Sequence, residues 1–307
     1  MAKVTIIGAG QAGATTAHWL AERGIADLVL VDIREGVARG KALDLMQAMP
    51  VIGSDAELVG TGDYEETVGS DIVVITAGAA RKPGMQREDL LTINSLIVET
   101  TVQESLQHSP DAVLIILTNP LDAMSLVALR ASGLPRERVL GQAGILDSAR
   151  MRCFVAMELG VSVENVHCYV LGGHGDSMVP LVRHSNVAGV PLVDILPTDR
   201  LEAIVERTRK AGGEIISLLG TGSAYYAPGA ALAQMVEAVL LDRHRIVPAS
   251  VYLQGEYGLS GICFGVPVQL GRGGMERILE LDLNPEEQQA LQASAAYVRE
   301  TIEALPD

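Results

Sequence analysis

The sequence predicts an α/β fold, with a doubly wound parallel sheet followed by an α+β second half. Short apolar runs alternate with stretches of helical apolar spacing up to about residue 145. Glycine-rich or polar turns follow these runs, and beyond that point the alternation gives way to longer helices and paired strands. Alternating strands and helices form a parallel sheet covered by helices on both faces.

The chain begins with a strand that leads directly into a glycine-rich loop. The strand spans residues 4–7, the loop is Gly8-Ala9-Gly10-Gln11-Ala12-Gly13, and a helix follows over residues 15–23. A second apolar run, residues 28–31, ends at Asp32. Such a loop between strand and helix, with an acidic residue roughly 20 positions later, is the fingerprint of a dinucleotide-binding Rossmann unit.

Each part of this fingerprint has a mechanical reason. Gly8 makes the tight turn, Gly10 lets the backbone approach a pyrophosphate, and Gly13 lets helix and strand pack closely. Asp32 can accept hydrogen bonds from both hydroxyls of an adenosine ribose and would repel a 2′-phosphate, which favours NAD over NADP, although Arg34 nearby weakens that preference. A glycine-rich turn without a cofactor is the alternative.

Four further strands complete the predicted sheet. After Asp32 we expect, in order, a helix at 36–49, strands at 57–61 and 71–76, a helix at 89–106, a strand at 112–117, a helix at 120–132 and a strand at 139–141. Ligands of such sheets bind at the carboxyl ends of the strands. The glycine loop, Asp32, Thr76-Ala77-Gly78 and Thr118-Asn119 all follow strands and therefore lie at these ends.

The loop after the fourth strand carries positive charge in an otherwise acidic chain. Arg81, Lys82 and Arg87 flank a hinge at Pro83-Gly84. A loop with cations and a hinge at the ligand edge is typical of a lid that binds an anion. A solvated basic loop is the alternative.

Two later segments carry candidate catalytic side chains. Asp147 and Arg150 lie three residues apart, so a helix that runs to residue 158 would place them on one face. His174 lies among glycines in Gly172-Gly173-His174-Gly175-Asp176, which makes it accessible and a candidate general acid or base. A surface ion pair and a histidine in a plain turn are the alternatives.

The rest of the second half reads as mixed α and β structure. We expect antiparallel strands at 163–170 and 187–193, helices at 198–219 and 229–241, strands at 247–253 and 266–270, and a last helix that begins at Asn284-Pro285. This change of pattern predicts two domains, residues 1–145 and 146–307.

Composition narrows the classes of function. The net charge of −15 disfavours nucleic acids and anionic membranes as partners. The apolar runs are too short to span a bilayer, and the N-terminus lacks the regions of a signal peptide, so we expect a cytoplasmic protein. Three widely spaced cysteines, Cys153, Cys168 and Cys263, indicate free buried thiols in a reducing compartment, and we expect no metal site.

Taken together, these segments resemble the lactate/malate dehydrogenase superfamily, and within it the lactate-dehydrogenase-like malate dehydrogenases, in order along the whole chain. The motifs are the glycine loop, Thr76-Ala77-Gly78, Arg81-Lys82-Pro83-Gly84-Met85 with Arg87, Thr118-Asn119-Pro120, Gln142-Ala143-Gly144 with Asp147 and Arg150, and Gly172-Gly173-His174-Gly175-Asp176. The resemblance implies NAD-dependent, reversible oxidation of (S)-malate to oxaloacetate, a step of the tricarboxylic acid cycle.

The resemblance also implies a role for each matching residue. His174 would accept the hydroxyl proton, Asp147 would orient its imidazole, and Arg150 would grip the C1 carboxylate of the substrate. Arg87 would stabilise charge on the reacting oxygen. The residues that would contact the cofactor are Gly8, Ala9, Gly10, Gln11, Ala12, Gly13, Asp32, Asn94, Leu117, Thr118 and Asn119, and Asn119 would also contact the substrate. Asp147 beside His174 should raise the pKa of the imidazole.

Arg81 determines the expected substrate. In this family an arginine here accompanies malate dehydrogenases and a glutamine accompanies lactate dehydrogenases. Oxaloacetate has a second carboxylate where pyruvate has a methyl group, and a lid arginine closed over pyruvate would be a buried, unpaired cation. Met85 adds no offsetting negative charge. Ala224, beside Ser223, stands where many lactate enzymes have threonine.

Three other functions remain as alternatives. They are an L-lactate or other 2-hydroxyacid dehydrogenase, an NAD-dependent glycoside hydrolase, and a non-catalytic NAD-binding protein. The hydrolase would need a metal site, for which no Cys/His cluster is evident in the sequence. The family resemblance also suggests a homodimer or homotetramer.

Overall fold

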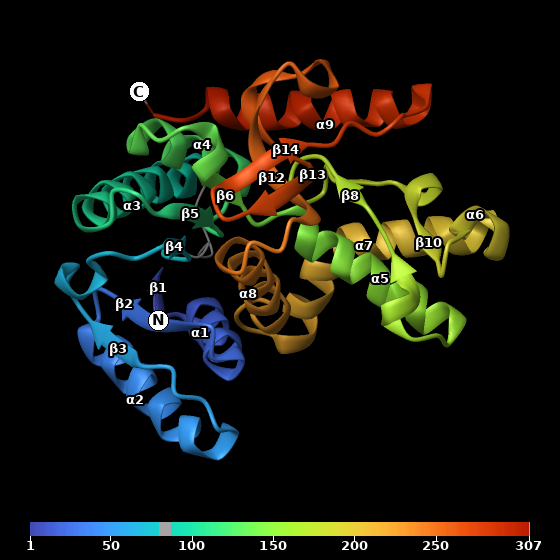
Figure 1. Ribbon diagram of the computed structural model, residues 1–307. Helices are drawn as coiled ribbons and strands as arrows, with labels where there is room; N and C mark the ends of the chain where they lie inside the picture. The colour runs from blue at the N-terminus through green and yellow to red at the C-terminus, as the bar shows by residue number, and fades with distance from the viewer. Residues whose placement is uncertain (80–86, 307) are drawn as a thin grey trace.

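A nine-stranded mixed sheet organises the part of the chain that the structure describes, residues 1–79 and 87–306 of a computed structural model (Figure 1). Its strand order is β14-β13-β12-β6-β5-β4-β1-β2-β3. The parallel strands are β1 Ala2–Ile7, β2 Ala26–Val31, β3 Leu58–Thr61, β4 Ile72–Ile75, β5 Val113–Ile116 and β6 Val139–Gly141. The predicted doubly wound sheet is therefore confirmed, and its order reverses between β1 and β4, where ligands of this fold bind.

Helices cover both faces of the parallel sheet, and consecutive residues of a strand point to opposite faces, so all of the parallel strands except the edge strand β3 are largely buried on both sides. Ile6 and Val74 belong to one apolar cluster, whereas their neighbours Ile7 and Ile75 belong to the other. The helices on the first face are α1 Gln11–Arg23, α2 Glu35–Ile52 and α8 Tyr226–Leu240, and those on the second face are α3 Arg87–His108 and α4 Leu121–Ser132. This double burial explains the continuous apolar runs of the sequence.

Three antiparallel strands from the second half extend the same sheet. They are β12 Arg245–Gln254, β13 Ser260–Gly271 and β14 Gly274–Ile278. β12 pairs with β6 where Ser250 lies opposite Gly141. The sheet thus continues past residue 145, where the sequence predicts a domain boundary, and that boundary stays a prediction.

The remaining elements surround this sheet. The other helices of the described chain are α5 Gly144–Leu159, α6 Leu192–Ile195, α7 Thr198–Leu219 and α9 Pro285–Glu303, with 3₁₀ turns at Glu65–Thr67, Arg136–Arg138, Val163–Asn165, Val182–His184 and Glu256–Gly258. Short strands β7 Val166–His167, β10 Asn186–Val187 and β11 Val190–Pro191 form one small sheet, and β8 Val170–Leu171 pairs with β9 Val179–Pro180. Figure 1 shows α9 along the top of the molecule, above β12 and β14.

The two strands expected at 163–170 and 187–193 are wrong in extent. The first is interrupted because the Ser162 side chain accepts a hydrogen bond from the backbone of Glu164 and caps a 3₁₀ turn. The second breaks at Ala188 and Gly189, which have positive φ, and its end becomes α6. The two expected segments pair with each other through β7 and β10, which are antiparallel.

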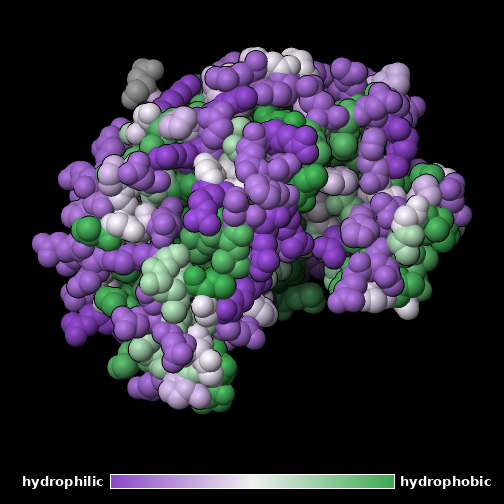
Figure 2. Space-filling model, in the orientation of Figure 1, coloured by the Kyte–Doolittle hydropathy of each residue, from purple (hydrophilic) through white to green (hydrophobic). Residues whose placement is uncertain are grey.

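The surface is mainly polar, and Figure 2 shows apolar patches between polar side chains, including one on the lobe that contains α2. Leu43, Val51 and Ile52 are exposed there. No helix of the described residues is long and apolar enough to cross a membrane. All three cysteines are free thiols, but Cys153 is exposed, contrary to the expected burial, because it lies on the outer face of α5 next to exposed Met157.

Candidate active site

His174 and Asp147 form a hydrogen-bonded pair. His174 follows β8 in a loop whose glycines Gly172 and Gly175 have φ of 90° and 114°, which a residue with a Cβ rarely adopts. Asp147 lies in the first turn of α5 and is 1% exposed. Its Oδ2 is 2.8 Å from His174 Nδ1. Because an ionised carboxylate only accepts hydrogen bonds, Nδ1 carries the hydrogen and Nε2 is left to accept a proton.

The electrostatic surroundings of His174 favour its protonated form. Burial alone would lower the pKa of the imidazole. The charge and hydrogen bond of Asp147, together with the charge of Asp122, outweigh burial and the opposing charge of Arg150, so the pKa is raised above its ordinary value. The direction is the one that the sequence predicts.

Arg150 extends this pair toward an anion. Its Nη1 lies 3.2 Å from Asp147 Oδ1, and its side chain is 13% exposed. Asp147 is buried, so the pair is not the surface ion pair that was the alternative. Arg150 Nε is buried and has no hydrogen-bond partner among the described residues. A buried donor without a partner is costly, and a bound carboxylate would satisfy it.

A cavity of about 230 Å³ brings His174 together with the carboxyl end of β5. Its lining includes Asn119, which follows that strand, and Ser177 and Tyr297. Of the substrate-binding residues expected from the sequence, Asn119 therefore shares one cavity with His174. Arg150 reaches the same histidine through Asp147.

The glycine loop has the shape that a dinucleotide requires. A Cβ on Gly13 would lie 2.0 Å from Gly8 O, so only glycine permits this packing of α1 against β1. A Cβ on Gly10 would meet nothing within 4 Å, and no side chain caps the N-terminus of α1 there. The loop therefore leaves open space in front of unpaired helix N–H groups, where a pyrophosphate fits. Ala9 is buried, whereas Gln11 is exposed and Ala12 is partly exposed.

Asp32 lies at the end of β2, where the fingerprint predicts it. Its Oδ2 accepts a hydrogen bond from Ala9 N at 2.9 Å, and its Oδ1 accepts one from Arg34 N at 2.9 Å. The Arg34 side chain is 69% exposed and lies 3.6 Å from that carboxylate. Asp32 therefore fixes the glycine loop and still presents its carboxylate next to it.

Lys41 is a contributor to this site that the sequence analysis missed. Its Nζ on α2 donates to Ala9 O at 2.8 Å and to Gly10 O at 3.1 Å. Burial lowers the pKa of Lys41, and the charge of Asp32 opposes that shift. The only available signal was that lysine is rare in this chain.

Asn94 connects the ends of two strands. Its Oδ1 accepts from Ala79 N at 2.7 Å, and its Nδ2 donates to Asn119 O at 2.7 Å. Asn94 is 1% exposed, whereas Asn119 is exposed. Thr118 is also buried, and its hydroxyl donates to Ala77 O. The partners of Asn94 are main-chain atoms, so its contact with the cofactor stays a prediction.

The remaining predicted site residues can be placed only in part. Arg81 lies outside the described residues. Arg87 begins α3, and the structure describes its backbone alone. Leu117 is partly buried directly after β5. Ser223 is exposed in the segment before α8.

Ser177 is a second polar residue that the sequence analysis missed. It lines the cavity with His174, and its hydroxyl is buried without a hydrogen-bond partner among the described residues. It lies only three positions after the histidine, but a serine in a glycine-rich segment carries no distinctive signal in a single sequence.

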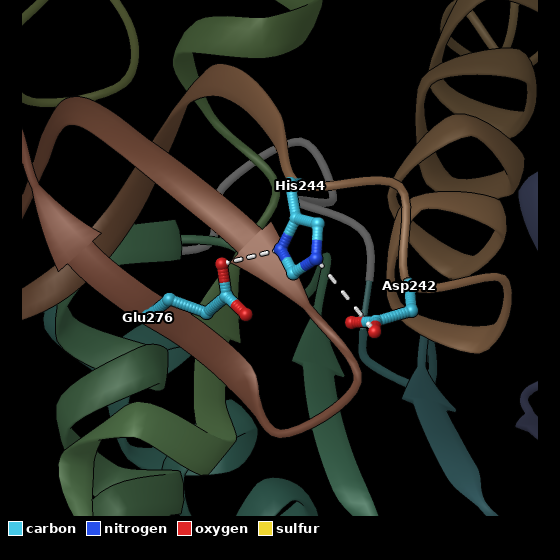
Figure 3. Close-up of side chains that lie close together, drawn as sticks. All are labelled: Asp242, His244 and Glu276. Carbon is cyan, nitrogen blue, oxygen red and sulfur yellow. Dashed lines mark hydrogen bonds and ion pairs between the residues drawn. The ribbon is translucent and has the colours of Figure 1, made fainter.

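Another cluster of ionisable side chains lies away from this site, in the turn between α8 and β12. Figure 3 shows the imidazole of His244 between two carboxylates. Its Nδ1 is 2.8 Å from Glu276 Oε2, and its Nε2 is 3.7 Å from Asp242 Oδ2. The hydrogen bond to Glu276 and the charges of both acids raise the pKa of His244. With one carboxylate near each ring nitrogen, His244 links the turn before β12 to β14.

A larger cavity, about 400 Å³, lies at the amino ends of the parallel strands. Its lining includes Ala2, Asp71 and Arg138, and none of the predicted site residues. Ligands of doubly wound sheets bind at the opposite ends of the strands. The smaller cavity at His174 is therefore the candidate active site.

Known proteins and family models match both halves of the chain. The family model for the lactate/malate dehydrogenase NAD-binding domain matches residues 2–141, and that for the lactate/malate dehydrogenase alpha/beta C-terminal domain matches residues 145–306. The malate dehydrogenase of Thermomicrobium roseum is 58% identical over 303 residues, which cover 99% of this chain and 98% of the relative.

Solved structures of related enzymes have the same fold. The malate dehydrogenase from Salinibacter ruber is 48% identical, with a TM-score of 0.95 over 99% of this chain and 97% of that one. A lactate dehydrogenase from Cryptosporidium parvum, solved with lactic acid and nicotinamide adenine dinucleotide, is 41% identical, with a TM-score of 0.96 over 99% of this chain and 98% of that one. With both halves matched and identity above half over nearly its whole length, this chain belongs to the lactate/malate dehydrogenase family.

Proposed function

We propose that this chain is an NAD-dependent malate dehydrogenase that interconverts (S)-malate and oxaloacetate. The observation that supports this proposal most strongly is the chain of contacts from His174 through the buried Asp147 to Arg150, whose Nε has no hydrogen-bond partner among the described residues. It provides a proton acceptor, a group that orients it and an anion-binding guanidinium in one place. The relatives above half identity carry the name malate dehydrogenase.

In malate oxidation, His174 Nε2 takes the hydroxyl proton of the substrate. Asp147 holds the ring in the tautomer that leaves Nε2 free and stabilises the imidazolium that forms. Arg150 binds the C1 carboxylate through two parallel N–H donors, which fixes the carbon that loses hydride. Bound NAD supplies the hydride acceptor. Oxaloacetate reduction runs in reverse, with protonated His174 as the proton donor.

The lid loop selects the dicarboxylate in this proposal. Arg87 stabilises charge on the reacting oxygen, and Arg81 pairs with the second carboxylate of the substrate. The similarity of fold alone does not show whether malate or lactate is the substrate, because both malate and lactate dehydrogenases have this fold. The choice of malate over lactate therefore rests on Arg81 in the sequence and on the names of the relatives.

NAD is the proposed cofactor in preference to NADP. The open space at Gly10 and the uncapped α1 fit a pyrophosphate, and Asp32 beside the loop fits ribose hydroxyls. A 2′-phosphate would meet the Asp32 carboxylate. The Arg34 side chain is largely exposed and does not cancel this repulsion.

We further propose a cytoplasmic homodimer or homotetramer. The free thiols fit a reducing compartment. Exposed apolar residues on α2, among them Leu43 and Val51, fit a contact between subunits. Sedimentation analysis of the purified chain distinguishes monomer, dimer and tetramer.

His174→Asn tests the catalytic assignment. Asparagine cannot exchange a proton near neutral pH, so turnover with malate and with oxaloacetate should fall by about 10² to 10⁴-fold, while NADH binding measured by fluorescence is retained. The matched control is His167→Asn, at an exposed histidine of β7, which should keep wild-type turnover. Unchanged turnover in His174→Asn would refute the assignment.

The alternative of an NAD-dependent glycoside hydrolase can be distinguished from the dehydrogenase by its requirement for a metal ion. Oxidation of NADH by oxaloacetate should be insensitive to EDTA if the dehydrogenase proposal is right. Absence of this activity, together with hydrolysis of a glycoside that EDTA abolishes and a divalent cation restores, would favour the hydrolase class instead.

A further inference from the structure

Three successive backbone N–H groups around His174 are held by three different elements. Each hydrogen bond is 2.9 Å long, and they run from Gly172 N to Gly265 O of β13, from Gly173 N to Ser294 Oγ of α9, and from His174 N to Asp122 Oδ2 of α4. The first two acceptors are neutral. The third is a carboxylate, so it acts on His174 through charge as well as through position.

Asp122 is buried beside the histidine. It lies in the first turn of α4, is 6% exposed and lines the same cavity as His174. Its second oxygen, Oδ1, accepts a hydrogen bond from Ser250 Oγ at 2.7 Å. Among the described residues, Ser250 and the backbone of His174 donate hydrogen bonds to Asp122, and no lysine or arginine forms an ion pair with it.

Two donors and a helix end support the charged form of this carboxyl group. Burial, the largest cause, raises the pKa of Asp122 above its ordinary value, and the hydrogen bonds from Ser250 and from the His174 backbone oppose this shift only in part. The positive N-terminal end of α4 also favours an anion at this position. Each oxygen of the carboxyl group accepts a hydrogen bond, which is the geometry that an ionised carboxylate requires.

His174 thus lies between two carboxylates with different contacts. Asp147 binds the ring at Nδ1, and Asp122 binds the main chain of the same residue. The charged groups of the described chain that act most on the imidazole are these two acids, which favour its protonation, and Arg150, which opposes it. A second carboxylate offsets the charge of the guanidinium that binds the substrate.

We propose that Asp122 is a positioning residue for the reaction: it fixes the backbone of His174, and its negative charge favours the protonated imidazole. The inference rests on the proposed role of His174 as proton acceptor. It adds a group that does not touch the substrate and that sets the pH range in which each direction of the reaction is fast.

The variant Asp122→Asn distinguishes the effect of the negative charge of Asp122 from the effect of its hydrogen bond to the His174 backbone. The side-chain oxygen of asparagine can accept from His174 N, and its amide can donate to Ser250 Oγ, so the contacts are kept while the charge is removed. We expect the pKa of His174 to fall by about 0.5 to 1 unit. NMR titration of ring-labelled histidine, assigned with His174→Asn, measures this shift without substrate.

The two directions of the reaction should respond differently in Asp122→Asn. Oxaloacetate reduction needs protonated His174, so the alkaline limb of its pH profile moves to lower pH. If the pKa of His174 falls by one unit, kcat/KM at high pH falls by up to about tenfold. Malate oxidation needs neutral His174, so the acid limb of its pH profile also moves to lower pH, and malate oxidation at low pH becomes faster. A purely structural defect would lower both directions at every pH.

Ser294→Ala is the matched control. It removes the neutral anchor on Gly173 N and leaves the charges unchanged, so it should lower kcat/KM without moving either limb. Asp122→Ser, a smaller neutral variant, should shift the pKa of His174 in the same direction and replaces the asparagine variant if that one does not fold.

The outcomes separate this inference from the proposed function. An unchanged pKa of His174 in the neutral variants, or equal losses in both directions at all pH values, would overturn the role of Asp122. Failure of the wild-type chain to oxidise NADH with oxaloacetate would overturn the proposed function, while the NMR titration would still report on the charge of Asp122.

Discussion

Arg81→Gln tests how one side chain selects the substrate. Removing the guanidinium removes the partner of the second carboxylate of oxaloacetate and the unpaired cation that pyruvate would meet. A hydrogen bond to a charged group contributes about 1.5 to 3 kcal/mol, so kcat/KM with oxaloacetate should fall about ten- to a hundredfold, and activity with pyruvate should rise. Steady-state NADH oxidation with each substrate measures both changes.

Lys82→Gln is the control for Arg81→Gln, because it removes one positive charge from the same loop. It should keep the preference for oxaloacetate. If Arg81→Gln also kept that preference, the specificity would have to come from elsewhere in the site.

Sequence reasoning predicted that His174, Asp147 and Arg150 belong to one site because each has a distinctive sequence neighbourhood. His174 lies among glycines, and the two other residues share a helical face. The structure places them in contact. Asp122 and Lys41 were not identified, because their partners are backbone atoms 52 and 32 positions away, and such contacts leave no local pattern.

The first turn of α9 offers a test of local stability. Asn284 Oδ1 accepts from Glu287 N at 2.8 Å, and Glu287 Oε2 accepts from Asn284 N at 2.9 Å, which is a complete capping box. Asn284→Ala should lower the free energy of unfolding by about 1 kcal/mol. The midpoint of urea unfolding should fall accordingly.

Asn284→Ser is the matched control for this cap. Serine also accepts a hydrogen bond at a helix N-cap, so its midpoint should stay near that of the wild type. Equal loss in both variants would mean that the cap contributes nothing specific and that another contact of Asn284 matters.

Helices and strands could be predicted from the sequence where the spacing of apolar residues and the helix-capping residues indicate the same element. The parallel strands β1, β2, β4, β5 and β6 are largely buried on both faces and contain continuous apolar runs, whereas Val59 of the edge strand β3 is exposed. The N-cap at Asn284 with Pro285 marks α9 correctly. The strands expected at 163–170 and 187–193 failed because a serine cap and two residues of positive φ compete with extended structure. Tertiary contacts decide whether such a segment forms a strand or a turn, and a single sequence does not show these contacts.

The continuation of the sheet across the two halves was also not predictable. β12 and β13 were expected as strands, but the pairing of β12 with β6 was not expected. The pairing of Ser250 with Gly141 joins positions more than a hundred residues apart. Ser250 also donates a hydrogen bond to Asp122, which in turn accepts one from the backbone of His174. The strand pairing that connects the two halves therefore also supports the loop of His174.

The whole molecule joins an NAD-binding sheet to a second half in which His174 contacts two carboxylates. The most direct test of this account is the rate of NADH oxidation by the purified chain with oxaloacetate and with pyruvate, repeated with NADPH. We predict rapid oxidation with oxaloacetate and NADH, and a much lower rate with pyruvate or with NADPH. A rate with pyruvate equal to or above that with oxaloacetate, or no oxidation with either, would contradict it.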